Sequence, residues 1–271
     1  MTLASLLPPS PQPPLAGRDA RRQRWQQALL RHASPRQAHA LAGRILPWAW
    51  GIAALATLAG LYVGFFVAPT DHQQGEAYRI IFVHVPAAWL SMVLYVAMAF
   101  WGAVGWVFNT RASSMLARAL APTGALFCFL ALWTGALWGK PTWGTWWVWD
   151  ARLTSELILL FLYLGVMALQ SAIDDPRRGD HAGTLLAVVG VVNVPVIYFS
   201  VKWWNTLHQG ASISLKAAPT LASSMLTGLL LCTVGLWAWA LAVVLQRLRL
   251  IVLQREQHAD WVLQAQREER A

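Results

Sequence analysis

Charged residues are scarce in this sequence, and their scarcity excludes an ordinary soluble domain. Aspartate, glutamate, lysine and arginine make up 12% of the chain, whereas apolar residues make up 57%. A soluble globular domain carries roughly 25% charged residues. A chain with half that share is expected to be solvated by lipid, and its remaining charge is basic, +9 net at pH 7.

Cysteine is also rare, which excludes several kinds of metal site. The two cysteines are Cys128 and Cys232, and each lies in a long apolar run. The chain has no C-x-x-C pair, no c-type haem attachment motif and no zinc-ligand spacing. Both cysteines are therefore expected to be buried as small apolar residues.

Motifs of the common hydrolytic and phosphate-binding enzymes are also missing. The sequence has no serine elbow, no metal-hydrolase spacing and no glycine-rich phosphate loop after a strand. ATP binding and nucleophilic catalysis are therefore not expected, and no nucleic-acid partner is expected either. These absences favour a carrier or assembly protein over a conventional enzyme.

Six apolar runs dominate the chain after residue 44. Each is long enough for the roughly 20 residues that a membrane-spanning helix needs. The expected spans are 45–67, 86–108, 116–137, 153–173, 184–203 and 222–245. The fold class is therefore all-α, a polytopic membrane protein with six transmembrane helices. Asn193 and Pro195 interrupt the fifth run, where the asparagine is expected either to bond a neighbouring helix or to face a cavity.

Two polar segments, 1–44 and 246–271, flank this six-helix domain at 45–245. The first is basic and starts with several prolines. Four of its residues recur at helical spacing among arginines: Trp25, Ala28, Leu29 and His32. It is expected to be either a short helix on an anionic membrane surface or a disordered extension. The second is expected to extend the sixth helix into the cytoplasm.

Lysine and arginine are distributed unequally between the two sides of such a bundle. With these spans, sixteen fall on the side of the termini and five on the other side. Positive residues concentrate on the cytoplasmic side of a membrane. Both termini are therefore expected in the cytoplasm, and the loops at about 68–85, 138–152 and 204–221 are expected on the outer face.

The outer loop at 138–152 is the most unusual stretch of the chain. Five of its fifteen residues are tryptophans, interrupted by two glycines and a proline. Tryptophans concentrate at membrane interfaces, which accounts for Trp203 and Trp204 beside the fifth span. Five in one connection exceed what such a belt requires. A run broken so often is expected to be neither a strand nor a helix interior, and a flat, apolar, large partner is expected to lie against it.

Two histidines, His84 and His208, fall near the outer membrane boundary. Either one alone is compatible with an interfacial polar residue. Together, beside an aromatic loop, they match the two axial imidazoles of a haem, whose flat macrocycle suits indole rings. Its anionic propionates favour arginine or lysine at the rim. On the outer face, Arg79, Lys140, Arg152 and Lys202 could fill this role.

Asp150 and Arg152 directly follow the last tryptophan of the loop. Asp150 is expected to cap the N-terminus of the fourth span, and direct contact with a ligand is the alternative. Arg152 and Glu156 are four residues apart on that helix, so an ion pair is expected. The pair is either purely structural or holds Arg152 towards a propionate.

The stretch Trp143-Gly-Thr-Trp-Trp-Val-Trp-Asp-Ala-Arg-Leu-Thr-Ser155 resembles the WWD signature of membrane haem-handling proteins in cytochrome c biogenesis. The flanking stretches Phe82–Trp89 and Val201–Gly210 resemble those of one family in this group, CcmC or haem exporter protein C. The resemblance covers about residues 45–245. Other members of the group are much longer, and residues 1–40 have no counterpart that can be placed in the family.

This resemblance implies a function. CcmC-like proteins hold haem at the periplasmic face of the bacterial inner membrane and pass it to the haem chaperone CcmE, to which it becomes covalently attached. The resemblance therefore implies a b-type haem, not covalently bound to this chain. It implies further partners in ABC transporter subunits and a small single-span subunit, besides membrane lipids. The binding residues implied are His84 and His208 as iron ligands, with Trp143, Trp146, Trp147, Trp149, Asp150 and Arg152 around them.

Two other classes of protein are the alternatives. A cytochrome b-like electron-transfer subunit would place histidines in the middle of the spans, where these runs have none. A transporter of haem or another solute would need broken helices or ionisable residues at mid-membrane. Asn193 and Pro195 give this second alternative limited support.

Overall fold

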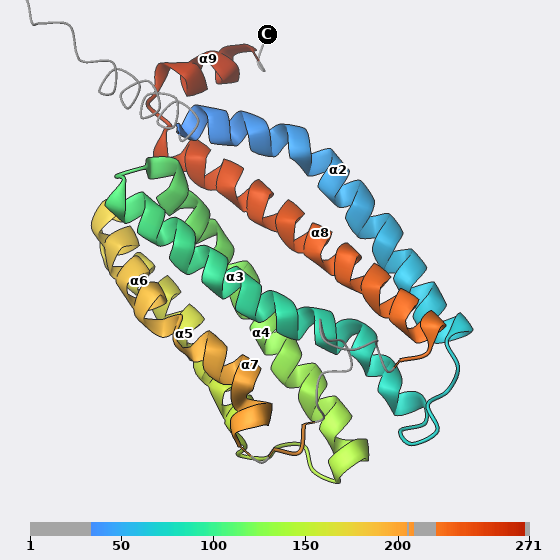
Figure 1. The fold of residues 1–271 in the computed structure, drawn as a ribbon. Helices are drawn as coiled ribbons and strands as arrows, with labels where there is room; N and C mark the ends of the chain where they lie inside the picture. Colours follow the sequence, from blue (N-terminus) through green and yellow to red (C-terminus); the bar gives the residue numbers. More distant parts are fainter. Residues whose placement is uncertain (1–33, 205, 209–220, 269–271) are drawn as a thin grey trace, which may run out of the picture.

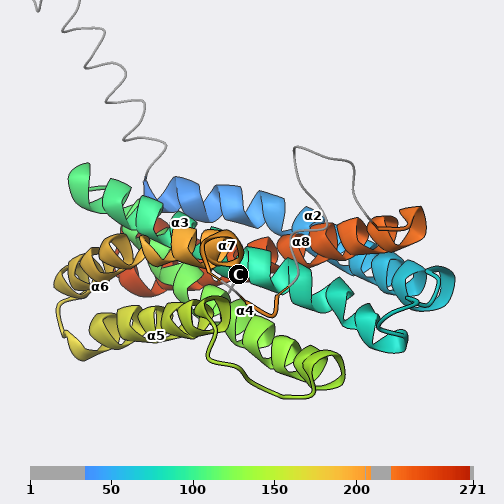
Figure 2. The same ribbon diagram turned by 60° about the horizontal axis from the view of Figure 1, so that its bottom comes forward.

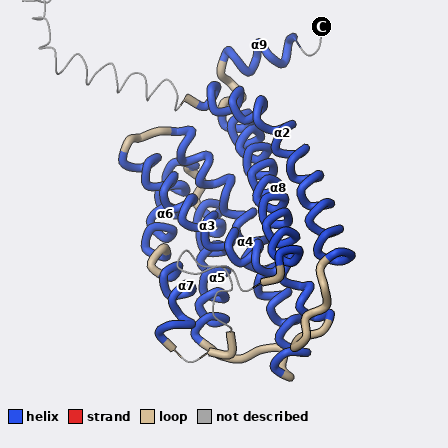
Figure 3. Tube along the Cα trace, turned by 45° about the vertical axis from the view of Figure 1, so that its right-hand side comes forward, coloured by secondary structure: helices blue, strands red, loops and turns tan. Residues whose placement is uncertain are grey.

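The computed structural model describes residues 34–204, 206–208 and 221–268, and this part of the chain is helical without strands (Figure 1). Its elements are α2 (Pro35–Tyr62), the π-helix η2 (Val63–Val67), the 3-10 helix η3 (Glu76–Ile80), α3 (Ile81–Val107), α4 (Arg111–Trp143), α5 (Ala151–Ala172), α6 (Pro176–Gly190), α7 (Asn193–Trp203), α8 (Ser223–Arg255) and α9 (Asp260–Glu268). Figure 3 shows that the loops gather at the two ends of the bundle.

Six helical segments of the described chain are long and apolar enough to cross a membrane. They are Pro35–Val67, Glu76–Val107, Arg111–Trp143, Ala151–Ala172, Pro176–Trp203 and Ser223–Arg255. The predicted all-α, multi-pass membrane fold with six spans is confirmed.

The first helix begins earlier than the apolar run that predicts it. Ser34 accepts a hydrogen bond from the backbone nitrogen of Gln37 at 3.3 Å, and Pro35 follows in the first helical turn. A serine cap followed by proline is a favourable helix start. The basic helix predicted around Trp25 lies outside the described residues.

Neighbouring helices pack in pairs. Figures 1 and 2 show α2 and α8 side by side on one flank of the bundle, with α5 and α6 on the opposite flank, and α3 packs along α4 between them. Segments 68–75, 144–150 and 206–208 lie at one end, which we call the histidine end. The start of α2 and the end of α8 lie at the other, which we call the tail end. There Trp261 of α9 packs on His39 of α2, with 5.7 Å between ring centroids.

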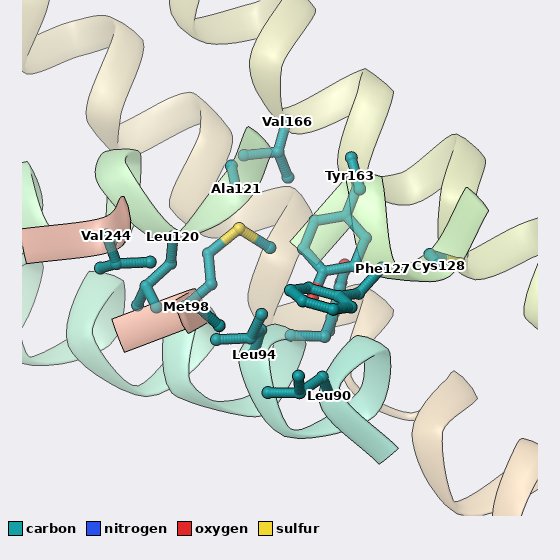
Figure 4. Close-up of a cluster of buried hydrophobic side chains, with 14 of the residues drawn as sticks. Leu90, Leu94, Met98, Leu120, Ala121, Phe127, Cys128, Tyr163, Val166 and Val244 are labelled. Carbon is teal, nitrogen blue, oxygen red and sulfur yellow. The ribbon is translucent and has the colours of Figure 1, made fainter. Parts of the chain in front are cut away.

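The centre of the bundle is filled by side chains from α3, α4, α5 and α8 (Figure 4). Tyr95 and Tyr163 meet edge to face with 4.9 Å between centroids, and the Tyr163 hydroxyl donates to the backbone oxygen of Ser91 at 2.7 Å. Cys128 and Cys232 are both buried free thiols. This confirms the prediction from their apolar surroundings.

The fifth span is broken between α6 and α7, just before Asn193. The Asn193 side-chain amide donates to the backbone oxygen of Ser155 in α5 at 2.8 Å. The predicted bond to a neighbouring helix is therefore confirmed. It fixes the second half of the span against α5, close to the histidine end.

Glycines allow α2 and α8 to approach closely. A Cβ atom on Gly235 of α8 would lie 2.6 Å from the backbone nitrogen of Thr57 in α2. We expect Gly235→Ala to destabilise the bundle by about 1–3 kcal/mol, because the two backbones must separate to admit the methyl group. The measurement is the unfolding midpoint of the purified protein in mixed micelles.

Gly51→Ala is the matched control on α2. A Cβ at this position meets nothing within 4 Å, so alanine should leave the midpoint unchanged or raise it slightly through its helix propensity. Equal destabilisation by both variants would contradict the close-packing argument.

Candidate functional site

His84 lies in the first turn of α3, where Thr134 of α4 holds its imidazole. His84 Nδ1 is 2.9 Å from Thr134 Oγ1. The Thr134 hydroxyl donates its proton to the Leu130 carbonyl oxygen at 2.6 Å, so Oγ1 acts as acceptor towards the imidazole. This assigns the His84 proton to Nδ1 and leaves the lone pair on Nε2 available for a metal.

Residues of α4 and of the loop at 68–75 complete the surroundings of His84. Trp138 lies edge-on to the imidazole with 5.6 Å between centroids, and its Nε1 donates to Gln74 at 2.7 Å. A Cβ on Gly135 would lie 3.1 Å from His84 Cε1. The sequence alone did not predict that Thr134 contacts His84. The available signal was that Thr134 and Trp138 are one helical turn apart on the same face.

Asp150 has two roles, of which the sequence indicated one. Its Oδ1 accepts from the backbone nitrogen of Leu153 at 2.8 Å, which confirms the predicted cap of α5. Its Oδ2 lies 3.0 Å from His208 Nδ1. A carboxylate only accepts, so the His208 proton is on Nδ1 and Nε2 carries the lone pair. Burial lowers the pKa of His208, and the hydrogen bond to Asp150 opposes that effect.

The tryptophan stretch is only partly a loop, so the prediction that it is not helical is wrong for its first half. α4 continues to Trp143 with Pro141 in its last turn, and the loop comprises 144–150. The reason is the position of the terminating glycine. Gly144 has a left-handed φ of 79°, and its N–H bonds to the Lys140 carbonyl oxygen at 3.1 Å. This is a glycine cap of the kind that ends helices.

The tryptophans around this loop form a surface beside His208. Trp143 lies edge-on to that imidazole with 4.9 Å between centroids, and Trp147 packs on Trp149 at 5.4 Å. Trp146 and Trp149 are 54% and 76% exposed. The Trp147 Nε1 is buried without a hydrogen-bond partner among the described residues. An aromatic surface with an unused buried donor is suited to a large, mostly apolar ligand.

Arg152 lies in the first turn of α5, two residues after Asp150, which contacts His208. The predicted ion pair with Glu156 is wrong, because no such pair occurs among the described residues. Glu156 is buried and accepts a hydrogen bond from Cys128 Sγ at 3.2 Å. The glutamate therefore points towards α4, and Arg152 keeps its charge at the histidine end.

The other described basic residues at the histidine end, Arg79, Lys140 and Lys202, make different contacts. Arg79 pairs with Glu76 and donates to the Ala68 carbonyl oxygen at 3.2 Å, so it ties η3 to the end of the first span. Its role is structural rather than at a ligand's rim. Lys140 and Lys202 lie over aromatic rings.

The donor set does not suit a bare metal ion. Among the described residues there is no group of three or more His, Cys, Asp or Glu side chains that could hold one. Two imidazoles with available Nε2 atoms instead match the axial positions of an iron whose other four ligands come from a porphyrin. The number of donors therefore suits a metal complex that carries its own equatorial ligands.

The chain is similar to known proteins over most of its length. The family model described as CcmC, heme exporter protein C, matches residues 28–263. Heme exporter protein C of Escherichia coli K12 is 44% identical over 230 residues, which cover 85% of this chain and 93% of that protein. The protein of the same name in Haemophilus influenzae is 45% identical over 231 residues, with 85% and 94% covered. A putative cytochrome c biosynthesis ccmC-like mitochondrial protein of Marchantia polymorpha is 46% identical over 170 residues, with 63% and 70% covered. The chain therefore belongs to the haem exporter protein C (CcmC) family of the cytochrome c maturation system.

Proposed function

We propose that this chain binds haem at the periplasmic face of the bacterial inner membrane and delivers it to a haem chaperone of the CcmE type. His84 and His208 would be the axial ligands. The observation that supports this most directly is that each imidazole has its Nδ1 held, by Thr134 and by Asp150. Both Nε2 atoms are then available for iron, which is how proteins fix a histidine for metal binding.

The residues around the histidines suit the rest of a haem. Trp143, Trp146, Trp147 and Trp149 supply apolar surface for the macrocycle, and Arg152 supplies a cation for a propionate. Asp150 acts on the ligand through His208. The haem would be b-type and non-covalent, since both cysteines of the chain are buried within the bundle.

The position of the site at one end of the bundle is consistent with a carrier that releases its ligand. Trp146 and Trp149 are exposed there and offer aromatic contacts to a protein partner as well as to haem. The distribution of lysine and arginine predicts that this end lies outside and both termini lie in the cytoplasm. The ABC transporter subunits and the small single-span subunit of the same system are the other partners in this proposal. The protein would act as a transfer and assembly platform rather than as an enzyme.

The proposal is tested with purified wild-type protein. Its haem complex should show a six-coordinate, low-spin absorption spectrum, because two imidazoles form a strong ligand field. The haem should then pass to purified chaperone added in excess. A five-coordinate spectrum, or haem that stays on this chain, would contradict the proposal. Haem accumulation inside liposomes that contain this chain alone would favour the transporter alternative.

A further inference from the structure

A second site of interest lies at the tail end of the bundle, opposite the histidines. It is a cavity of about 820 Å³ between the end of α3, the start of α4, the connection from α5 to α6, and the last turn of α8. These segments can be followed at the upper left of Figure 1. None of the proposed haem-binding residues lines it.

The walls of this cavity are set by close backbone packing. Asn109 turns α3 into α4 with a left-handed φ of 52°, and a Cβ on Gly105 would lie 2.9 Å from the backbone nitrogen of Ser114. On the opposite wall, a Cβ on Gly179 would lie 3.2 Å from the Gln170 carbonyl oxygen. Two tight helical hairpins therefore form part of the cavity's wall.

One buried carboxylate in this cavity faces two guanidinium groups. Asp180 is 3% exposed and is held at both oxygens by Arg255, with 3.0 Å from Nη2 to Oδ1. Arg118 approaches the same carboxylate at a longer 3.5 Å and donates to the Gln170 carbonyl oxygen at 3.2 Å. The cluster therefore keeps an excess positive charge within the wall.

Arg118 has unused hydrogen-bonding capacity. Both of its contacts use Nη1, and its Nε and Nη2 donors have no partner among the described residues. Arginine carries five N–H donors in a planar fork that fits phosphate and carboxylate oxygens. The side chain is 29% exposed, so its remaining donors are accessible from the cavity.

Two other charged residues that line the cavity are already engaged. Asp175 caps α6 by accepting from the backbone nitrogens of Arg177 and Arg178, at 2.9 Å each. Arg111 pairs with Glu256. Four arginines and three aspartates line the cavity, and Glu256 balances Arg111, so the attraction for an anion rests on the free donors of Arg118 rather than on a net charge of the lining.

We propose that this cavity binds a phosphate group, with Arg118 as its principal ligand. The cavity lies where the spans end, which is the depth of lipid headgroups, and basic side chains at that depth are suited to anionic phospholipids. A soluble phosphate has the same chemistry and is the other source. The proposal is independent of the haem site.

The test uses the full chain, purified and placed in phosphatidylcholine nanodiscs. Phosphatidylglycerol is titrated into the nanodiscs in one arm, and inorganic phosphate is added in the other. Ligand that binds only the folded state raises the unfolding temperature with concentration. We expect such a rise for wild type and, for Arg118→Gln, an affinity lower by about tenfold, the effect of losing a charged hydrogen bond.

Variants make the test specific. In Arg118→Gln, Asp180 keeps its bond to Arg255, so the protein should still fold. If Arg118→Gln does not fold, Arg118→Lys, which keeps the charge, is used instead. Arg178→Gln is the matched control, because Arg178 is the exposed neighbour of a lining residue and does not line the cavity. A response to phosphatidylglycerol alone supports a lipid site, and a response to inorganic phosphate supports a soluble ligand. The proposal would be overturned if the unfolding temperature did not rise in either arm. It would also be overturned if Arg178→Gln lost as much ligand affinity as Arg118→Gln.

Discussion

His84→Ala and His208→Ala should each weaken haem binding by more than about 100-fold, since loss of a residue that merely orients a metal ligand already costs about 10–100-fold. Each substitution removes one axial nitrogen, so any haem that remains should be five-coordinate and high-spin. His208→Ala also removes the ring on which Trp143 packs. The measurements are haem titration and the absorption spectrum of each purified variant.

Free imidazole added to each alanine variant distinguishes loss of an iron ligand from misfolding. It should enter the space that alanine leaves and restore a low-spin spectrum, which general misfolding would not allow. His72→Ala is the control, because His72 is an exposed histidine of the first loop at the histidine end, and it should keep wild-type haem content. If both alanine variants kept the wild-type spectrum and haem content, the assignment of the axial ligands would be wrong.

Asp150→Asn should separate the two roles of Asp150. Asparagine caps helices as well as aspartate does, so α5 should stay intact. The asparagine amide nitrogen would instead face His208 Nδ1, which must then accept a hydrogen bond, and the imidazole proton moves to Nε2. A protonated Nε2 cannot bind iron. We therefore expect haem affinity to fall by about 10–100-fold without loss of stability.

Two comparisons complete the Asp150 experiment. Asp150→Ala should lose the same haem affinity and, in addition, about 1 kcal/mol of stability from the missing cap. Asp175→Asn changes the equivalent cap of α6, remote from the histidines, and should leave haem affinity unchanged. Haem titration and unfolding midpoints are measured for all three. Wild-type affinity in Asp150→Asn would show that the contact with His208 does not orient the ligand.

The features that sequence alone predicted depend on local chemistry. An apolar run of sufficient length commits a segment to a membrane helix whatever its neighbours are, so six spans could be counted directly. The Asp150 cap followed from the residue type before an apolar run. The WWD stretch and the segments around His84 and His208 predicted the family. The similarity to heme exporter protein C confirms it. The roles of these residues in haem binding stay predictions for the experiments above.

Tertiary structure decided how the site's residues are held. Thr134 and His84 are 50 residues apart in the chain, and Asp150 and His208 are 58 apart, so no local pattern pairs them. Glu156 had a suitable partner one turn away in Arg152 but turns towards Cys128, because a buried carboxylate takes the donor that the neighbouring helix offers. The sequence thus determined which residues reach the histidine end. Only the packing of α3, α4 and α5 decided which nitrogen of each imidazole is bonded within the protein and which is left available.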